Sequence, residues 1–456
     1  MAYAGPGAAA DARLLIAGVG STTTPATVSV QGTIDTIVGA STSNTYTLTT
    51  GVDQVNGGPG NDTFNAVLDN ATGVAAGGQA ATLQSFDSLN GGALGNTLNI
   101  DDFGMGGYMS IPTGASMTGM TTLNVNSLEA VSLDASGWSR LAKLNVLASQ
   151  GNDNVTAAPG VAVTVQDGLA ASTVTVHGGA GISVAGSGGA GLNGATIYGD
   201  SSTTSVSLAD VQAGQIFDAS YGTGKANSIA GVVLTDTGGE TDIYDDGLGT
   251  LTMTSTKGGN MGVSVFGTST VPLVTVNLDG EARGYVADDA ASKLVVNTAG
   301  SAVSQFYLEA QSATSLVFND AAGLSLTSNG YGSGETDYSF DAVHAATITI
   351  TGSGSFTADL GSHFETNHAD ATAAIDASAS SGMIAVEIGG GQSFTGGSGQ
   401  DVVTIYGVQS GTVAGGSASN NEVVLSGISG ASEADLAGLR NFPSWAWPAP
   451  PRAAST

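Results

Sequence analysis

Cysteine is absent from the 456 residues of this sequence. Its absence excludes disulfide bonds, thiolate catalysis and zinc sites built from thiolates. No apolar run approaches the roughly 18 residues that indicate a transmembrane helix. The first twenty or so residues have no basic segment ahead of their short apolar stretch, so they make a poor secretory signal peptide. If the protein is exported, we expect another route.

Basic residues are scarce. Nine lysines and arginines face 38 acidic residues, which gives a formal net charge of −29. Nucleic-acid binding needs a basic surface, and an anionic membrane would repel this chain. The expected neutralising partner is a hard divalent cation such as Ca²⁺, because such ions prefer oxygen ligands. The alternative is that the acidity only keeps a secreted protein soluble.

Large side chains are also few. Aromatic residues make up 6% of the chain, whereas glycine alone accounts for 70 residues. Such a sequence cannot build several thick globular cores, but it can build thin layers that each bury a few Val, Ile and Leu side chains. The hydrophobic content of 41% argues against wholesale disorder.

Short runs of alternating polar and apolar residues recur along the chain, and helical periodicity is almost absent. Each run is four to six residues long and is bounded by Gly, Asn, Asp or Ser, which is typical of β-strands and turns. Representative runs are TVSV (27–30), TYTLTT (45–50), AVSLD (130–134), AVTVQD (162–167), SVSLAD (205–210), TLTMTS (250–255), ATITITGSG (346–354) and VVTIYG (402–407).

The spacing of these runs indicates a repeat. Asn277, Asn297 and Asn319 follow similar strands at intervals of 20 and 22 residues. A degenerate period of about 20 with two strands per period predicts an all-β, elongated parallel β-solenoid, related to β-helices and β-rolls. We expect each asparagine to bond the backbone or to stack on its copy one coil away. The alternative is a string of tandem β-sandwich domains, but the few aromatics and the lack of clear linkers disfavour it.

Composition suggests four regions. We expect a flexible segment at 1–25, a glycine- and aspartate-rich β region at 26–160, a degenerate β-solenoid at 161–430, and a tail at 431–456. Within the tail, the stretch 433–440 predicts one short helix before an irregular end.

One nonapeptide carries the strongest chemical signal. The stretch GGPGNDTFN fits the pattern G-G-x-G-x-D-x-U-x, in which U is a large apolar residue. Its metal-site residues would be Gly57, Gly60 and Asp62, and those of the second copy GGSGQDVVT would be Gly396, Gly399 and Asp401. The glycines permit a tight turn, and the aspartate supplies a carboxylate beside the turn carbonyls. A phosphate-binding loop is excluded because no Lys-Ser/Thr pair follows. A plain turn without an ion remains the alternative.

Partial copies keep the same register. DQVNGG (53–58) returns as DSLNGG (87–92), and SQGNDNV (149–155) retains Asp153. Because runs of the repeat are short, a complete calcium site would need ligands from a coil distant in sequence. Asp53 beside Asp87 is the best candidate for such a pair.

These nonapeptides resemble those of the RTX family of secreted, calcium-binding bacterial proteins. The longer block over roughly 45–100 resembles RTX-type surface-layer proteins and related β-strand-repeat exoproteins. The resemblance implies type I secretion, calcium-dependent folding outside the cell and assembly into a lattice or filament at the bacterial cell surface. Two features depart from the family: a long tandem repeat block is missing, and the C-terminus does not resemble a type I export signal.

The sequence therefore predicts a structural, non-enzymatic, secreted protein that self-assembles with Ca²⁺ into a surface layer or filament. Its partner would be further copies of itself, with a cell-surface polysaccharide as a second candidate. An adhesin or matrix-binding module of the same fold is the alternative. A polysaccharide lyase or hydrolase is a further alternative, with Arg283 near Glu281, Asp288 and Asp289 as its best grouping.

Overall fold

The computed structural model describes most of the chain after residue 42. The described ranges are 43–58, 60–70, 80–92, 94–104, 107–187, 191–223, 228–268, 274–280, 283–326, 340–361, 369–427 and 437–446. They contain strands and turns and no helix, so they hold no helix long and apolar enough to cross a membrane. The predicted strand at 27–30 and the predicted flexible segment at 1–25 lie outside these ranges.

The chain divides into two compact units, Met1–Ile182 and Ser183–Thr456, and each is described by itself. The first unit contains β1 (Thr45–Thr47), β2 (Gln54–Asn56), β3 (Thr63–Asn70), β4 (Ser88–Asn90), β5 (Asn96–Phe103), β6 (Tyr108–Met109), β7 (Ser116–Thr118), β8 (Met120–Ser127), β9 (Ala130–Asp134), β10 (Lys143–Ala148), β11 (Asp153–Thr156), β12 (Ala162–Asp167) and β13 (Thr173–His177). Strand β14 (Gly181–Gly186) spans the division.

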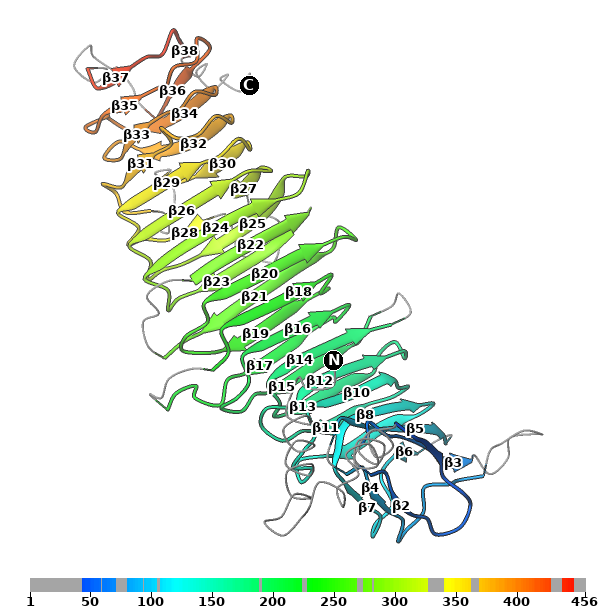
Figure 1. Cartoon of the computed structure of the whole chain (residues 1–456). Helices are drawn as coiled ribbons and strands as arrows, with labels where there is room; N and C mark the ends of the chain where they lie inside the picture. Colours follow the sequence, from blue (N-terminus) through cyan, green and yellow to red (C-terminus); the bar gives the residue numbers. More distant parts are fainter. Residues whose placement is uncertain are drawn as a thin grey trace, which may run out of the picture. The chain divides into compact units, whose positions relative to one another are not determined.

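Parallel pairing organises the first unit. One sheet runs in the order β1–β3–β5–β8–β10–β12, and a second runs β6–β9–β11–β13. A short third sheet joins β2, β4 and β7. Each turn of the chain thus places its strands beside the equivalent strands of the previous turn (Figure 1), which makes it one coil of a solenoid.

The second unit repeats the plan with two sheets. Its strands are β15 (Gly194–Tyr198), β16 (Ser205–Ala209), β17 (Gly214–Phe217), β18 (Gly231–Thr235), β19 (Glu240–Tyr244), β20 (Thr250–Ser255), β21 (Asn260–Phe266), β22 (Val274–Gly280), β23 (Arg283–Asp288), β24 (Lys293–Ala299), β25 (Ser304–Glu309), β26 (Ser315–Asp320), β27 (Leu324–Leu326), β28 (Phe340–Asp341), β29 (Thr347–Thr351), β30 (Phe356–Asp359), β31 (Ala374–Asp376), β32 (Ile384–Gly389), β33 (Ser393–Thr395), β34 (Asp401–Tyr406), β35 (Val413–Ala414), β36 (Glu422–Ser426), β37 (Leu439–Arg440) and β38 (Ser444–Ala446).

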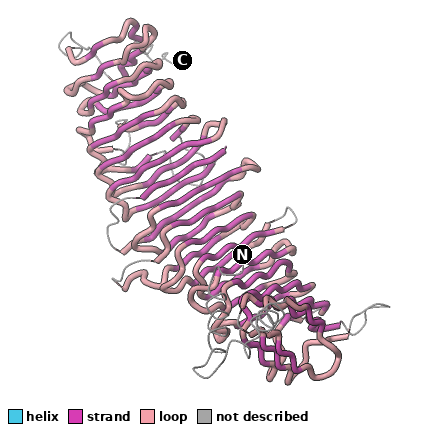
Figure 2. The backbone as a smooth tube through the Cα atoms, in the orientation of Figure 1, coloured by secondary structure: helices cyan, strands magenta, loops and turns pink. Residues whose placement is uncertain are grey.

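One sheet of this unit runs β16–β18–β20–β22–β24–β26–β29–β31–β33–β35–β37. The other runs β15–β17–β19–β21–β23–β25–β27–β30–β32–β34–β36–β38, with β28 also paired to β25. Turns and loops join the strands of successive coils (Figure 2). The parallel pairing confirms the predicted β-solenoid and excludes tandem sandwiches, whose sheets are antiparallel.

The core of each coil is thin. Along β24 the side chains alternate between the two faces of the sheet, with Leu294, Val296 and Thr298 buried inside. Val, Leu and Ile supply most of the buried residues, and only a few coils hold a phenylalanine such as Phe64 or Phe318. This filling explains how the chain folds with so few aromatics.

Asparagines stack on the outer face, as their spacing predicts. In the second unit Asn297 donates to Asn277 at 2.8 Å and Asn319 donates to Asn297 at 2.7 Å. A second ladder in the first unit runs through Asn65, Asn99, Asn124 and Asn145, with each amide–amide hydrogen bond at 2.8 Å. Each amide thus bonds its copy on the next coil.

The helix predicted at 433–440 is wrong at its C-terminal end. Leu439 and Arg440 form β37 and pair in parallel with β35. The backbone hydrogen bonds of the preceding coil extend the sheet here and override the local helical pattern. Ser444–Ala446, expected as irregular tail, forms β38 and pairs with β36. Residues 433–436 lie outside the described ranges.

Candidate functional site

The first nonapeptide forms the turn before β3, and Asp62 lies at its buried end with 1% of its surface exposed. In-register pairing places Asn44 and Asn96 at the equivalent position of the two neighbouring coils. The backbone N–H of Asn44 donates to Asp62 Oδ1, and the backbone N–H of Asp62 donates to Asn96 Oδ1, both at 2.8 Å. Asp62 is therefore one rung of a ladder that fastens each turn to the next.

The second nonapeptide repeats the bond to the following coil, whereas the residue opposite Asp401 on the previous coil is Ile384. Asp401 is fully buried, and its backbone N–H donates to Asn421 Oδ1 at 2.9 Å. The N–H of Gly416, on the following coil, donates back to Asp401 Oδ2 at 2.8 Å. Burial raises the pKa of the Asp401 carboxyl, and hydrogen bonds from Gly416 and Gly397 oppose that rise. In both copies the neighbour after the aspartate is a neutral asparagine, not a second carboxylate.

The first glycine of the motif makes room for the aspartate. A Cβ placed on Gly57 would lie 2.4 Å from Asp62 Oδ2, and one on Gly396 would lie 2.1 Å from Asp401 Oδ2. Gly399 has a different neighbour, since its Cβ would lie 2.0 Å from the carbonyl oxygen of Gly382 on the previous coil. These contacts account for Gly57, Gly396 and Gly399 by close packing. Gly60 is buried in the same turn as Gly57.

Asp53 and Asp87 lie one coil apart, because β2 and β4 pair with Gln54 opposite Ser88. The backbone N–H of Asp53 donates to Asp87 Oδ1 at 2.8 Å, and the N–H of Gln84 donates to Asp87 Oδ2 at 2.7 Å. The Asp53 carboxylate accepts from the N–H of Thr49 at 2.8 Å. The structure therefore brings Asp53 and Asp87 onto neighbouring coils as predicted, and each carboxylate accepts hydrogen bonds from backbone N–H groups.

Asp153 is also buried and binds the previous coil. The N–H of Val131 donates to its Oδ1 at 2.8 Å, and the hydroxyl of Ser149 donates to its Oδ2 at 2.5 Å. Burial, as the main cause, raises the pKa of Asp153 to about 6, and the nearby charge of Asp167 adds to the rise.

Further buried aspartates at strand ends were not predicted as a group. Asp245, Asp288 and Asp320 are at most 1% exposed, and each has one carboxylate oxygen without a hydrogen-bond partner among the described residues. Asp62 Oδ2 and Asp401 Oδ1 share that property. Burial raises the pKa of Asp245 to about 7. The alternation of side chains along a strand could have identified these aspartates in the sequence. Asp320 lies two residues after the buried Phe318, so its side chain points to the same inner face.

A bound cation could coordinate these carboxylate oxygens that have no hydrogen-bond partner among the described residues. Ca²⁺ takes six to eight oxygen ligands. Asp62 lies between Asn44 and Asn96, and Asp401 lies between Ile384 and Asn421, so each motif turn offers one carboxylate with no second carboxylate at the equivalent position of a neighbouring coil. The described residues contain no group of three or more His, Asp or Glu side chains placed to hold a metal ion. The predicted ligands therefore fit a calcium roll poorly, and calcium binding at Asp53, Asp62, Asp87, Asp153 and Asp401 stays a prediction.

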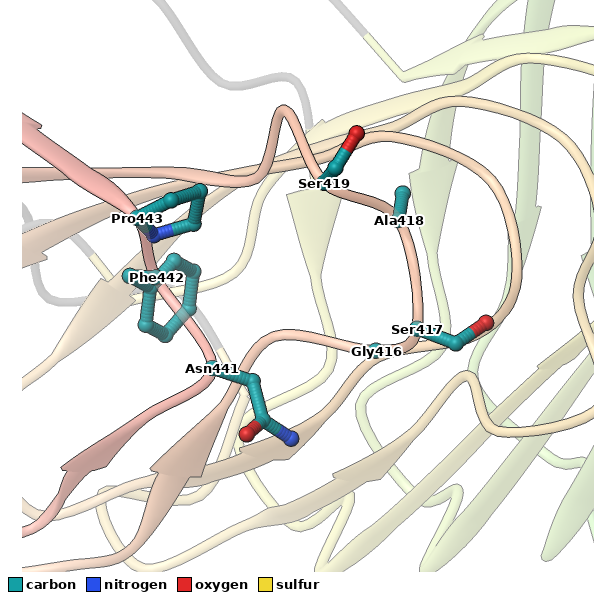
Figure 3. A pocket seen from close by; sticks show the side chains of 7 residues that line it. All are labelled: Gly416, Ser417, Ala418, Ser419, Asn441, Phe442 and Pro443. Atoms are coloured by element: carbon teal, nitrogen blue, oxygen red, sulfur yellow. The ribbon is translucent and has the colours of Figure 1, made fainter.

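An open pocket of about 570 Å³ lies beside the coil that follows the second motif. Figure 3 shows its lining residues, which come from the turn after β35 and from the segment between β37 and β38. None of the lining side chains carries a charge, so the pocket supplies no metal ligand of the kind predicted. The lining residues are Gly416, Ser417, Ala418, Ser419, Asn441, Phe442 and Pro443.

Of the enzyme-like grouping around Arg283, Asp288 lies on the opposite face of the strand, and Glu281 lies outside the described residues. Arg283 and Asp288 stand five residues apart on one strand, so their side chains point to opposite faces of the sheet. Asp288 is inside the coil, where its Oδ1 accepts the N–H groups of Ala290 and Ala291, both at 3.0 Å. This arrangement gives Arg283 no carboxylate partner at Asp288.

Comparisons with known proteins add no family. A search against protein-family profiles found no match, and a search of curated protein sequences found no significant match.

Proposed function

We propose that the protein is a structural component of an extracellular assembly, a surface layer or a filament built from copies of this chain. One observation carries the proposal: the described coils are fastened to one another by side chains as well as by the sheets. Hydrogen bonds from Asp62 to Asn96 and from Asp401 to Asn421 join the turns of neighbouring coils. Hydrogen bonds among Asn277, Asn297 and Asn319 join the outer faces of neighbouring coils. Such fastening stabilises a repeated stack.

Composition supports the same role. A chain with a net charge of −29 and no cysteine suits an environment that is rich in divalent cations and independent of disulfides. The resemblance of the nonapeptides to RTX exoproteins supports secretion, calcium-dependent folding and a location at the bacterial cell surface. In the proposal, calcium screens the repulsion between chains that carry the same large negative charge.

Sedimentation of the purified full chain tests the proposal. We expect a large pelletable fraction that grows with protein concentration and with calcium, and that is lost at low protein concentration. A single sedimenting monomer at every concentration and calcium level would contradict self-assembly. A panel of acidic glycans incubated with the same protein separates the enzyme alternative, which predicts released product.

A further inference from the structure

Four aromatic side chains form a ladder on the outer face of one sheet of the second unit. Tyr198, Phe217, Tyr244 and Phe266 occupy the same position on β15, β17, β19 and β21. Consecutive ring centroids are 5.2, 4.6 and 4.9 Å apart, with interplanar angles of 9°, 4° and 17°. The rings are therefore stacked face to face along four successive coils.

The ladder is accessible to solvent. Tyr198 and Phe266, the two end rings, are each 42% exposed, and Phe217 and Tyr244 are half-buried. Because the rings cover one another's faces, the ladder presents a row of ring edges. A sugar ring, which stacks on an aromatic face, finds that face only at the two ends. A flat aromatic molecule can instead lie along the whole row in the edge-to-face arrangement that aromatic pairs favour.

A second row runs beside the ladder. Gln215, Asp242 and Ser264 precede Phe217, Tyr244 and Phe266 by two residues, so they lie on the same face of the sheet, with the Cα atoms of each pair about 7 Å apart. Gln215 is exposed, Asp242 is half-buried and Ser264 is buried. The residues between the rows, Ile216 and Ile243, point into the coil. The two rows are therefore adjacent on the outer face of the sheet, with backbone between them.

The outer face beside the ladder carries negative charge, because Glu240 and Asp242 alternate with inward residues on the strand that holds Tyr244. The carboxylates of Asp242 and Glu240 both raise the pKa of the Tyr244 hydroxyl, after burial as the main cause. Glu240 is fixed by the hydroxyl of Ser264, which donates to its Oε1 at 3.0 Å. Tyr221 packs against Tyr244 in an edge-to-face contact, with ring centroids 5.5 Å apart and an interplanar angle of 72°. Shape and charge together favour a ligand that is long, flat, aromatic and cationic.

We propose that this surface, formed by the aromatic ladder and the row of Gln215, Asp242 and Ser264, binds elongated planar aromatic cations. The ligand lies along the coil stack and spans the four rings, a length of about 15 Å from three strand spacings. Its flat face contacts the ring edges, and its positive charge faces Asp242. The site is independent of the structural role proposed above, because it needs only one folded chain.

Thioflavin T, a planar aromatic cation, is the probe. We expect saturable binding to the full chain, with a constant signal per chain as protein concentration is varied. Tyr244→Ala, which opens the middle of the ladder, should weaken binding roughly tenfold, since about 1.4 kcal/mol corresponds to that factor. Tyr108→Ala is the matched control, because Tyr108 is an exposed aromatic of the first unit outside the ladder.

Two conservative variants keep the test decisive if Tyr244→Ala does not fold. Tyr244→Phe retains the ring and should bind as wild type does. Asp242→Asn removes the central charge without a change in shape, so it should weaken binding and flatten its salt dependence. The proposal is overturned if the dye does not bind saturably, if Asp242→Asn binds as tightly as wild type, or if a planar aromatic anion binds equally well.

Discussion

The backbone N–H of Asp62 donates to the side-chain oxygen of Asn96, which lies 34 residues later in the sequence, at 2.8 Å. The equivalent contact joins Asp401 to Asn421 at 2.9 Å. In both full copies of the nonapeptide, the aspartate thus has an asparagine as its neighbour on the next coil. The motif builds a rung between two coils, and its stability effects can be tested residue by residue.

Asn96→Ala should destabilise the first unit. The substitution leaves the buried N–H of Asp62 without an acceptor, which costs about 1–3 kcal/mol. Urea unfolding followed by circular dichroism measures the effect. Asn126→Ala is the control, because Asn126 is exposed and bonds only Asp101. Equal midpoints for the two variants would show that the rung does not stabilise the coil.

Gly57→Ala and Gly396→Ala should each destabilise the protein by about 1–3 kcal/mol through overpacking. The added methyl would collide with a carboxylate that hydrogen bonds hold in place. Gly137→Ala is the control, since nothing lies within 4 Å of a Cβ at that position. Thermal unfolding of the three variants checks this, and similar melting temperatures would refute the packing account of the motif glycines.

Stability should rise as the pH falls from 8 towards 5. The pKa is about 7 for Asp245 and about 6 for Asp153 in the folded chain, against an ordinary value of 3.8. The folded state therefore binds protons more tightly than the unfolded state, so its stabilisation is complete below the ordinary pKa and is lost as the pH rises through 6 and 7.

For Asp245 alone the difference amounts to about 4 kcal/mol at most. Asp218 opposes the trend, because hydrogen bonds lower its pKa. Urea unfolding at a series of pH values is the measurement, and Asp245→Asn should flatten the profile between about pH 4 and pH 7, the interval between the unfolded and folded pKa values. A profile that is unchanged in Asp245→Asn would rule out this carboxyl as its source.

Calcium should raise the stability of the chain, and Asp62→Ala and Asp401→Ala should raise the calcium concentration needed for folding. Asp62→Asn is a more specific test than Asp62→Ala. The amide keeps an oxygen that accepts the hydrogen bond from Asn44, and it removes the negative charge and the second carboxylate oxygen, which has no hydrogen-bond partner. An ion present at 100 times its dissociation constant stabilises by about 2.7 kcal/mol. A calcium titration of melting temperature that is identical in wild type and Asp62→Asn would reject Asp62 as a ligand.

The strands and their period could be predicted from the sequence because side chains alternate between core and solvent in every coil. Runs such as 130–134 and 162–167 coincide with β9 and β12. The stacking of Asn277, Asn297 and Asn319 followed from the same repeat, since a fixed interval places equivalent residues on adjacent coils.

The role of the motif aspartates could not be predicted in this way. The nonapeptide specifies residue types within one turn, but the partner of Asp62 is set by the coil-to-coil register. That register spans 18 residues back to Asn44 and 34 residues forward to Asn96, because the loops differ in length. The aromatic ladder was missed for the same reason, since its four residues follow one another at unequal intervals of 19, 27 and 22.

Electron microscopy of the purified full chain, with and without calcium, tests the structural role most directly. The account predicts ordered sheets or filaments in calcium, and their loss when the ion is chelated. The Asp62→Asn and Asp401→Asn variants, imaged in the same calcium buffer, separate assembly driven by these turns from assembly driven by charge screening alone. Isolated, monodisperse particles of wild-type protein in both conditions would contradict the account.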